Sequence, residues 1–144
     1  MNVIGLPADV LPRRSLSQLL RLARVGLAEA DQESSHTQRY ATAHLAALRA
    51  ASALVVARSH PTLTRRRGRP PTVWELLPLV VPELASWASK FGALAGKKSA
   101  AQSGISHAVS ISDAEELLRD AERFTALVEL MLIPAVQPKL SLVG

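Results

Sequence analysis

The stretch between residues 40 and 55 constrains the fold most, because seven of its residues are alanine. Alanine has the highest helix propensity of the amino acids, so this stretch should form a helix. Small side chains also let a neighbouring helix axis approach to about 8 Å. We therefore predict a helix at the centre of a helical bundle. Its alanines stand at positions 41, 43, 46, 47, 50, 51 and 53.

The rest of the chain also favours helices. Hydrophobic residues make up 48% of the sequence but aromatic residues only 3%, so Ala, Leu and Val must build much of the core. The nearest approach to a strand pattern, residues 105–112, is too short to found a sheet. We predict an all-α, single-domain bundle of four to five helices over residues 15–132. A flexible N-terminus (1–14) and a C-terminal tail (133–144) would flank it.

Capping motifs and prolines give the expected helix boundaries. A Ser or Thr followed three residues later by Glu or Gln occurs at Ser35–Gln38, Thr72–Glu75 and Ser112–Glu115, which is the pattern of a capping box. Pro78 should kink or stop one helix, and Pro134 should end the last one. The expected helices span about residues 15–30, 35–58, 72–77, 82–104 and 112–134.

A strongly basic, proline-flanked loop is expected between the second and third helices. The segment 58–71 contains five arginines and no acidic residue. Without these five, the 17 basic residues of the chain fall to 12, which equals the number of acidic residues. Clustered guanidinium groups attract phosphates by charge and by bidentate hydrogen bonding. We predict that nucleic acid contacts this loop through Arg58, Arg65, Arg66, Arg67 and Arg69.

Two alternatives remain for this loop. Its Arg67-Gly68-Arg69-Pro70 core matches the central tetrapeptide of AT-hook motifs, which bind the minor groove of DNA, although its flanks depart from the usual form. Alternatively, the loop is a solvated connector between helices.

Arg39 and His44 form a candidate catalytic pair. An arginine that holds a phosphate and a histidine that moves a proton are the minimum for metal-independent RNA cleavage. Five residues at about 100° each, however, place the two about 140° apart around a helix. His44 lies on the apolar stripe with Tyr40 and Leu48, which is typical of a core histidine. Two copies of the pair could converge only across a dimer.

The sequence argues against several classes of site. It contains no cysteine, which excludes disulfides and thiolate ligands. His36, His60 and His107 are isolated from one another, so we expect neither a metal site nor a cofactor. The N-terminus does not have the pattern of a signal peptide, and no window approaches about 18 uninterrupted apolar residues. We therefore expect a cytoplasmic protein that does not enter a membrane.

Four ordered blocks of sequence resemble the small actinobacterial family of HEPN (higher eukaryotes and prokaryotes nucleotide-binding) domain proteins. The resemblance spans about residues 15–132 and implies a bundle of four or five helices, often dimeric. It also implies a superfamily tied to RNA binding, RNA cleavage and nucleotidyltransferase partners. The ribonuclease members are similar at Arg39 and His44, but they usually have a polar residue where Tyr40 follows the arginine, and they place the pair on a late helix. The blocks are residues 39–51, 73–77, 82–88 and 113–124.

These observations lead to one main functional hypothesis. The chain is expected to be a non-catalytic HEPN-like domain that binds RNA or another polyanion through its arginine-rich loop, as a homodimer. In a variant of this hypothesis, the loop binds DNA through the core formed by Arg67 to Pro70. The alternatives are a protein–protein interaction or regulatory module, and a metal-independent ribonuclease that uses Arg39 and His44.

Overall fold

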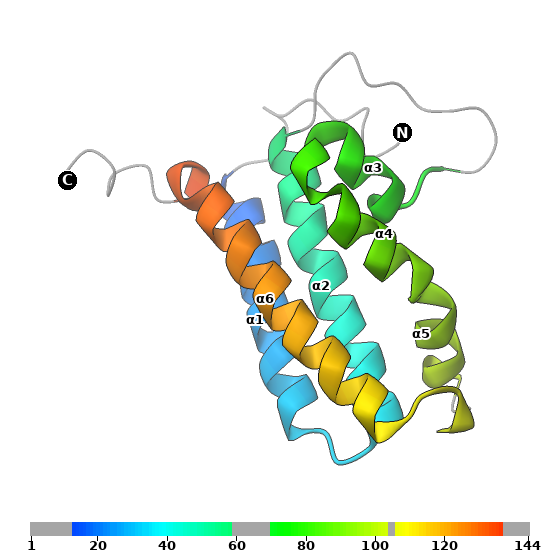
Figure 1. Ribbon diagram of the computed structural model, residues 1–144. Helices are drawn as coiled ribbons and strands as arrows, with labels where there is room; N and C mark the ends of the chain where they lie inside the picture. Colours follow the sequence, from blue (N-terminus) through cyan, green and yellow to red (C-terminus); the bar gives the residue numbers. More distant parts are fainter. Residues whose placement is uncertain (1–12, 59–69, 104–105, 137–144) are drawn as a thin grey trace.

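The computed structural model describes residues 13–58, 70–103 and 106–136, and every regular element in these ranges is helical. The predicted all-α fold class is therefore confirmed (Figure 1). The elements, in chain order, are α1 (Arg13–Gln32), α2 (His36–Arg58), α3 (Val73–Val80), the 3-10 turn η2 (Pro82–Leu84), α4 (Ala85–Ala93), α5 (Ala95–Gln102), the 3-10 turn η3 (Ser106–Ala108) and α6 (Ile111–Val136).

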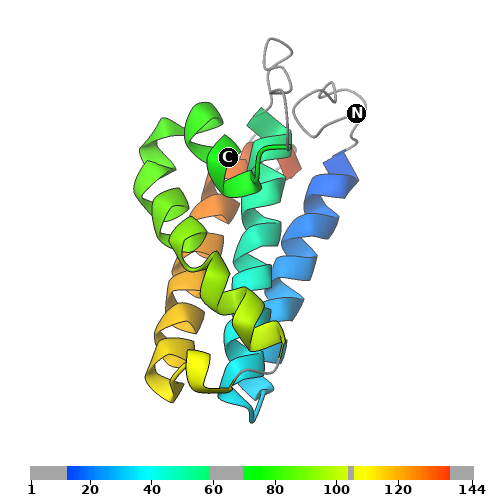
Figure 2. The same ribbon diagram turned by 90° about the vertical axis from the view of Figure 1, so that its right-hand side faces the viewer.

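Three long helices, α1, α2 and α6, lie side by side, and the shorter α3, α4 and α5 cover another side of α2 (Figures 1 and 2). Helix α2 contacts α1, α3, α5 and α6, as expected for the alanine-rich helix. Among the described helices, only α2 is long and apolar enough to cross a membrane by length and composition. Most of its apolar window is buried against the other helices, as in the central helix of a bundle.

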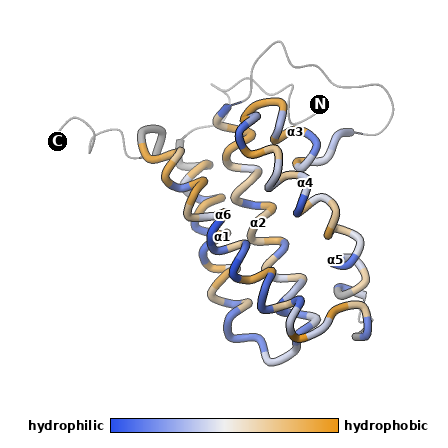
Figure 3. The backbone as a smooth tube through the Cα atoms, viewed as in Figure 1, coloured by the Kyte–Doolittle hydropathy of each residue, from blue (hydrophilic) through white to orange (hydrophobic). Residues whose placement is uncertain are grey.

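Small residues allow α1 and α2 to approach closely. A Cβ atom added to Gly26 of α1 would lie 3.2 Å from the Cβ of Ala46 on α2, which is tighter than ordinary packing. Ala43, Ala47 and Ala50 of α2 are likewise fully buried. Apolar and polar stretches alternate along α1 and α6 (Figure 3).

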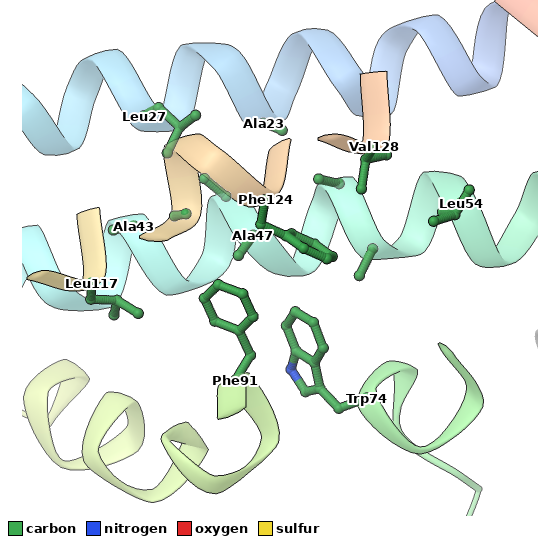
Figure 4. Packing of buried hydrophobic residues seen from close by; sticks show 14 of the residues in the cluster. Ala23, Leu27, Ala43, Ala47, Leu54, Trp74, Phe91, Leu117, Phe124 and Val128 are labelled. Atoms are coloured by element: carbon green, nitrogen blue, oxygen red, sulfur yellow. The ribbon is translucent and has the colours of Figure 1, made fainter. Parts of the chain in front are cut away.

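Aromatic side chains build the other half of the core. Trp74 of α3 stacks on Phe91 of α4 with ring centroids 5.1 Å apart, and Phe124 of α6 lies 5.2 Å from Phe91 (Figure 4). Trp87 completes the cluster at 5.6 Å from Phe124. Large aromatic side chains contribute the most buried area per residue. Four of the five aromatic residues thus join the short helices to α6.

The capping predictions have mixed outcomes. Thr72 and Glu75 form the full reciprocal box at the start of α3, which is confirmed. At Ser35, the backbone N–H of Gln38 donates to the side-chain oxygen over 3.3 Å. The box predicted at Ser112 and Glu115 is wrong, because Ser110 and Asp113 form it instead with bonds of 3.1 and 2.9 Å. Glu115 is engaged elsewhere, in an ion pair with Arg39.

The helix end predicted at Pro134 was wrong, and of the kink or stop predicted at Pro78 the stop was wrong. Helix α3 continues past Pro78 to Val80, and α6 continues past Pro134 to Val136, because a proline removes only one amide donor from a helix. The helix expected over residues 82–104 is divided, since α4 ends at Ala93 and α5 begins at Ala95. At this break the backbone N–H of Leu94 is shared between the carbonyls of Lys90 and Phe91.

Candidate functional site

Arg39 lies near the start of α2 and is half-buried. Its Nε donates to the carbonyl oxygen of Ala30 over 3.1 Å, and its Nη2 donates to that of Glu33 over 2.8 Å. Both carbonyls belong to the last turn of α1 or follow it directly. The Nη1 atom lies 3.5 Å from Oε2 of Glu115 on α6. Arg39 therefore caps the C-terminal end of α1, where a positive charge also opposes the helix dipole.

His44 is buried one turn further along α2, with only 2% of its surface exposed. Because a carbonyl can only accept, its Nε2 carries the proton and donates to the Phe91 oxygen over 2.9 Å. Nδ1 has no hydrogen-bond partner among the described residues. Desolvation by burial lowers the pKa of His44, outweighing the opposite effect of the bond to Phe91. The ring is therefore neutral near pH 7, with Trp74 and Phe91 packed edge-on against it.

The two candidate residues contact different helices within one chain. Arg39 holds the end of α1, whereas His44 donates to a carbonyl in the last turn of α4. This separation agrees with the angle of about 140° between them around α2. The structure also gives each side chain a structural role that spacing in the sequence could not reveal. Both are side-chain donors that satisfy carbonyls at a helix C-terminus.

The basic segment is described only at its borders. Arg58 is exposed at the last position of α2, and Arg65, Arg66, Arg67 and Arg69 lie outside the described residues. Helix α2 ends and α3 begins at the same end of the bundle (Figure 1). The capping box of Thr72 fixes the chain where it returns to that end.

Acidic residues gather at the opposite end of the bundle. The last turn of α1 and the loop after it carry three acids, and the first turns of α6 carry three more. Arg39 contacts both groups, since it donates a hydrogen bond to the Glu33 carbonyl and forms an ion pair with the Glu115 carboxylate. The 23 residues of α2, about 34 Å at 1.5 Å each, separate this end from Arg58. These six of the twelve acids are Glu29, Asp31, Glu33, Asp113, Glu115 and Glu116.

A metal centre is not evident in the described ranges. No three His, Cys, Asp or Glu side chains there are grouped so that they could hold a metal ion. His36 and His107 belong to these ranges, whereas His60 lies outside them.

Comparison with protein-family models matches residues 30–129 to the SAV_6107-like HEPN family. The match covers α2 to α5 completely, together with most of α6 and the end of α1. No curated protein and no solved structure matches the chain.

Proposed function

The chain belongs to the SAV_6107-like HEPN family, and on that premise we propose that it binds RNA through the arginines of segment 58–71 without cleaving it. The observation that carries the proposal is the concentration of charge. Five arginines and no acid occupy this segment, while the remaining charges of the chain balance. A homodimer would present two such segments to one strand and raise the affinity by avidity.

The distribution of acids supports this proposal. At physiological salt the Debye length is about 8 Å, so charges at the acid-rich end of the bundle are screened from Arg58, the first arginine of the basic segment. Several acids are also neutralised by partners within the fold, including Glu129 by Arg24 at 2.6 Å and Asp120 by Lys90 at 2.6 Å. These acids therefore contribute little to the field at Arg58.

The contacts of Arg39 and His44 favour binding over cleavage. A catalytic arginine must reach a phosphate, but the guanidinium of Arg39 already donates to two backbone carbonyls. A catalytic histidine must reach the scissile bond, but His44 is almost completely buried beneath Trp74 and Phe91. Both observations support a structural role for the pair.

Fluorescence polarisation with a labelled single-stranded RNA tests the binding proposal. We expect the variant with Arg65, Arg66, Arg67 and Arg69 all changed to Ala to bind more weakly than wild type. If each arginine contacts one phosphate, the slope of log affinity against log salt becomes shallower by about 0.7 per arginine, or about 2.8 in all. A control variant that removes four charges elsewhere should keep the wild-type slope, and it carries Ala at positions 21, 49, 98 and 119.

Two outcomes would contradict the binding proposal: equal loss of binding by both variants, or no salt-dependent binding by wild type. Preference for an AT-rich DNA duplex over RNA would instead favour the hook formed by Arg67 to Pro70. The non-cleaving part is tested by incubating the same RNA with wild type and His44→Ala in chelator. Cleavage by wild type that is lost in His44→Ala would overturn that part.

A further inference from the structure

A pocket of about 310 Å³ opens between α6 and the α4–α5 pair, above the first half of α2. It lies toward the acid-rich end of the bundle, since its residue Tyr40 stands 18 residues, or about 27 Å, before Arg58 on α2. Ala93, Leu94 and Leu117 give it apolar walls. At about 30 Å³ for each water-sized group, it could hold a molecule of roughly ten heavy atoms.

A buried phenol borders this pocket. Tyr40 is only 1% exposed, and its hydroxyl has no hydrogen-bond partner among the described residues. Burial, with a smaller contribution from the charge of Asp113, raises the pKa of Tyr40 to about 12. The phenol therefore stays neutral at physiological pH and can both donate and accept a hydrogen bond. A buried hydroxyl without a partner is unfavourable, so a bound ligand that pairs with it gains affinity.

One carboxylate at the pocket has no paired cation in the described part of the chain. Nζ of Lys90 lies 2.6 Å from Oδ2 of Asp120, and Nζ of Lys97 lies 3.3 Å from Oδ2 of Asp113, so each lysine is matched by one carboxylate. Glu116, one turn beyond Asp113 on the same face of α6, makes no ion pair with any described residue. Asp120 also lies 3.4 Å from Nη1 of Arg123, so Glu116 is the one carboxylate of the pocket that has no cation paired with it among the described residues.

These features select one class of ligand. An anion would meet the unpaired Glu116 carboxylate while Lys90 and Lys97 are already paired, and a neutral apolar molecule would leave the Tyr40 hydroxyl and the Glu116 charge unpaired. An ammonium group has three N–H donors, which suits a carboxylate and a phenol oxygen together. We propose that this pocket binds a small molecule with a primary ammonium group on a short aliphatic chain, held by Glu116 and Tyr40 and covered by Leu94 and Leu117.

The test uses three five-carbon probes on the full chain: n-pentylammonium, n-pentanol and pentanoate, each at the same ionic strength. Binding is followed by amide chemical shifts in two-dimensional NMR, which detect weak affinities. A ligand of six heavy atoms is expected to bind with Kd on the order of 1 mM. We expect saturable shifts in α6 and the α4–α5 pair for the ammonium, and at least tenfold weaker binding of the alcohol and the carboxylate.

Two variants identify the groups that hold the ammonium. Glu116→Gln changes an exposed side chain and should weaken binding about tenfold, and Tyr40→Phe, which removes only the hydroxyl, should also weaken it. Glu122→Gln removes the same charge from a part of α6 outside the pocket and should bind like wild type. The proposal is overturned by equal affinity for the three probes, by no saturable shift, or by unchanged binding in Glu116→Gln. Since none of these changes touches segment 58–71, the outcome is independent of RNA binding.

Discussion

His44 and Arg39 illustrate how polar side chains can be used inside a helical bundle. Each donates from α2 to carbonyls at the end of another helix, His44 to α4 and Arg39 to α1. The last carbonyls of a helix lack the amide four residues on that would complete the helical pattern, so a donor from a neighbouring helix adds a hydrogen bond to them and fixes the neighbour's position. These two side chains therefore contribute to the relative placement of α1, α2 and α4.

The burial of neutral His44 predicts a dependence of stability on pH. Its pKa is lowered in the folded state, so below about pH 6.5 the unfolded chain takes up a proton that the folded chain does not. The contribution is complete above pH 6.5 and is lost as the pH falls toward the folded pKa. The slope is at most about 1.4 kcal/mol per pH unit.

Urea denaturation of wild type and His44→Gln between pH 7.5 and pH 5 measures this effect. Glutamine can still donate to the Phe91 carbonyl but does not titrate, so its unfolding free energy should vary less with pH than that of wild type. Parallel pH profiles for the two proteins would show that His44 is not the group responsible.

The close approach of α1 and α2 depends on Gly26, which lacks the methyl group that an alanine would place between the two helices. An alanine at position 26 would raise helix propensity by about 1 kcal/mol but would place its Cβ 3.2 Å from that of Ala46. Ala46 is anchored directly to its backbone and can move only with α2, and overpacking of this kind costs about 1–3 kcal/mol. The steric effect should win, so we expect Gly26→Ala to lower the free energy of unfolding by about 1 kcal/mol.

Gly96 offers a matched control for this prediction. A Cβ atom on Gly96 would meet no heavy atom within 4 Å, and the residue lies in the helix α5. Gly96→Ala should therefore stabilise the protein by about 0.4–1 kcal/mol through the lower entropy of the unfolded chain. Chemical denaturation compares the two variants, and equal stabilisation by both would contradict the close approach of α1 and α2.

Over the whole molecule, charge is divided between two ends. The acids of α1 and the start of α6 gather at one end, and Arg58 with the segment that follows it leaves from the other. The separation of about 34 Å is several Debye lengths at physiological salt. Only acids close to the basic segment should affect how it binds a polyanion.

Neutralising one acid at each end tests this division. Glu83 is exposed and follows α3, within one short helix of the basic segment, whereas Asp31 is exposed at the far end of α1. At low salt, Glu83→Gln should raise RNA affinity about two- to threefold, because a negative charge only one short helix away from the basic segment is removed. Asp31→Asn should leave the affinity unchanged. Equal increases in polarisation titrations would mean that net charge, and not its location, governs binding.

The sequence determined the helical fold, and the reason is that the relevant signals are local. Alanine and leucine set helix propensity residue by residue, and the Thr72–Glu75 box joins groups only three residues apart. The concentration of positive charge in segment 58–71 is likewise a property of sequence order alone. The spacing of Arg39 and His44 also placed them on different sides of α2.

The tertiary structure decided the features that join residues far apart in the chain. Sequence spacing could not show that Phe91 accepts a hydrogen bond from His44, 47 positions earlier, or that α4 ends beside this bond. Glu115 was expected to cap its own helix, but it pairs with Arg39 instead. The pocket beside Tyr40 needs side chains from four packed helices. Such contacts depend on how helices pack, which local propensity does not specify.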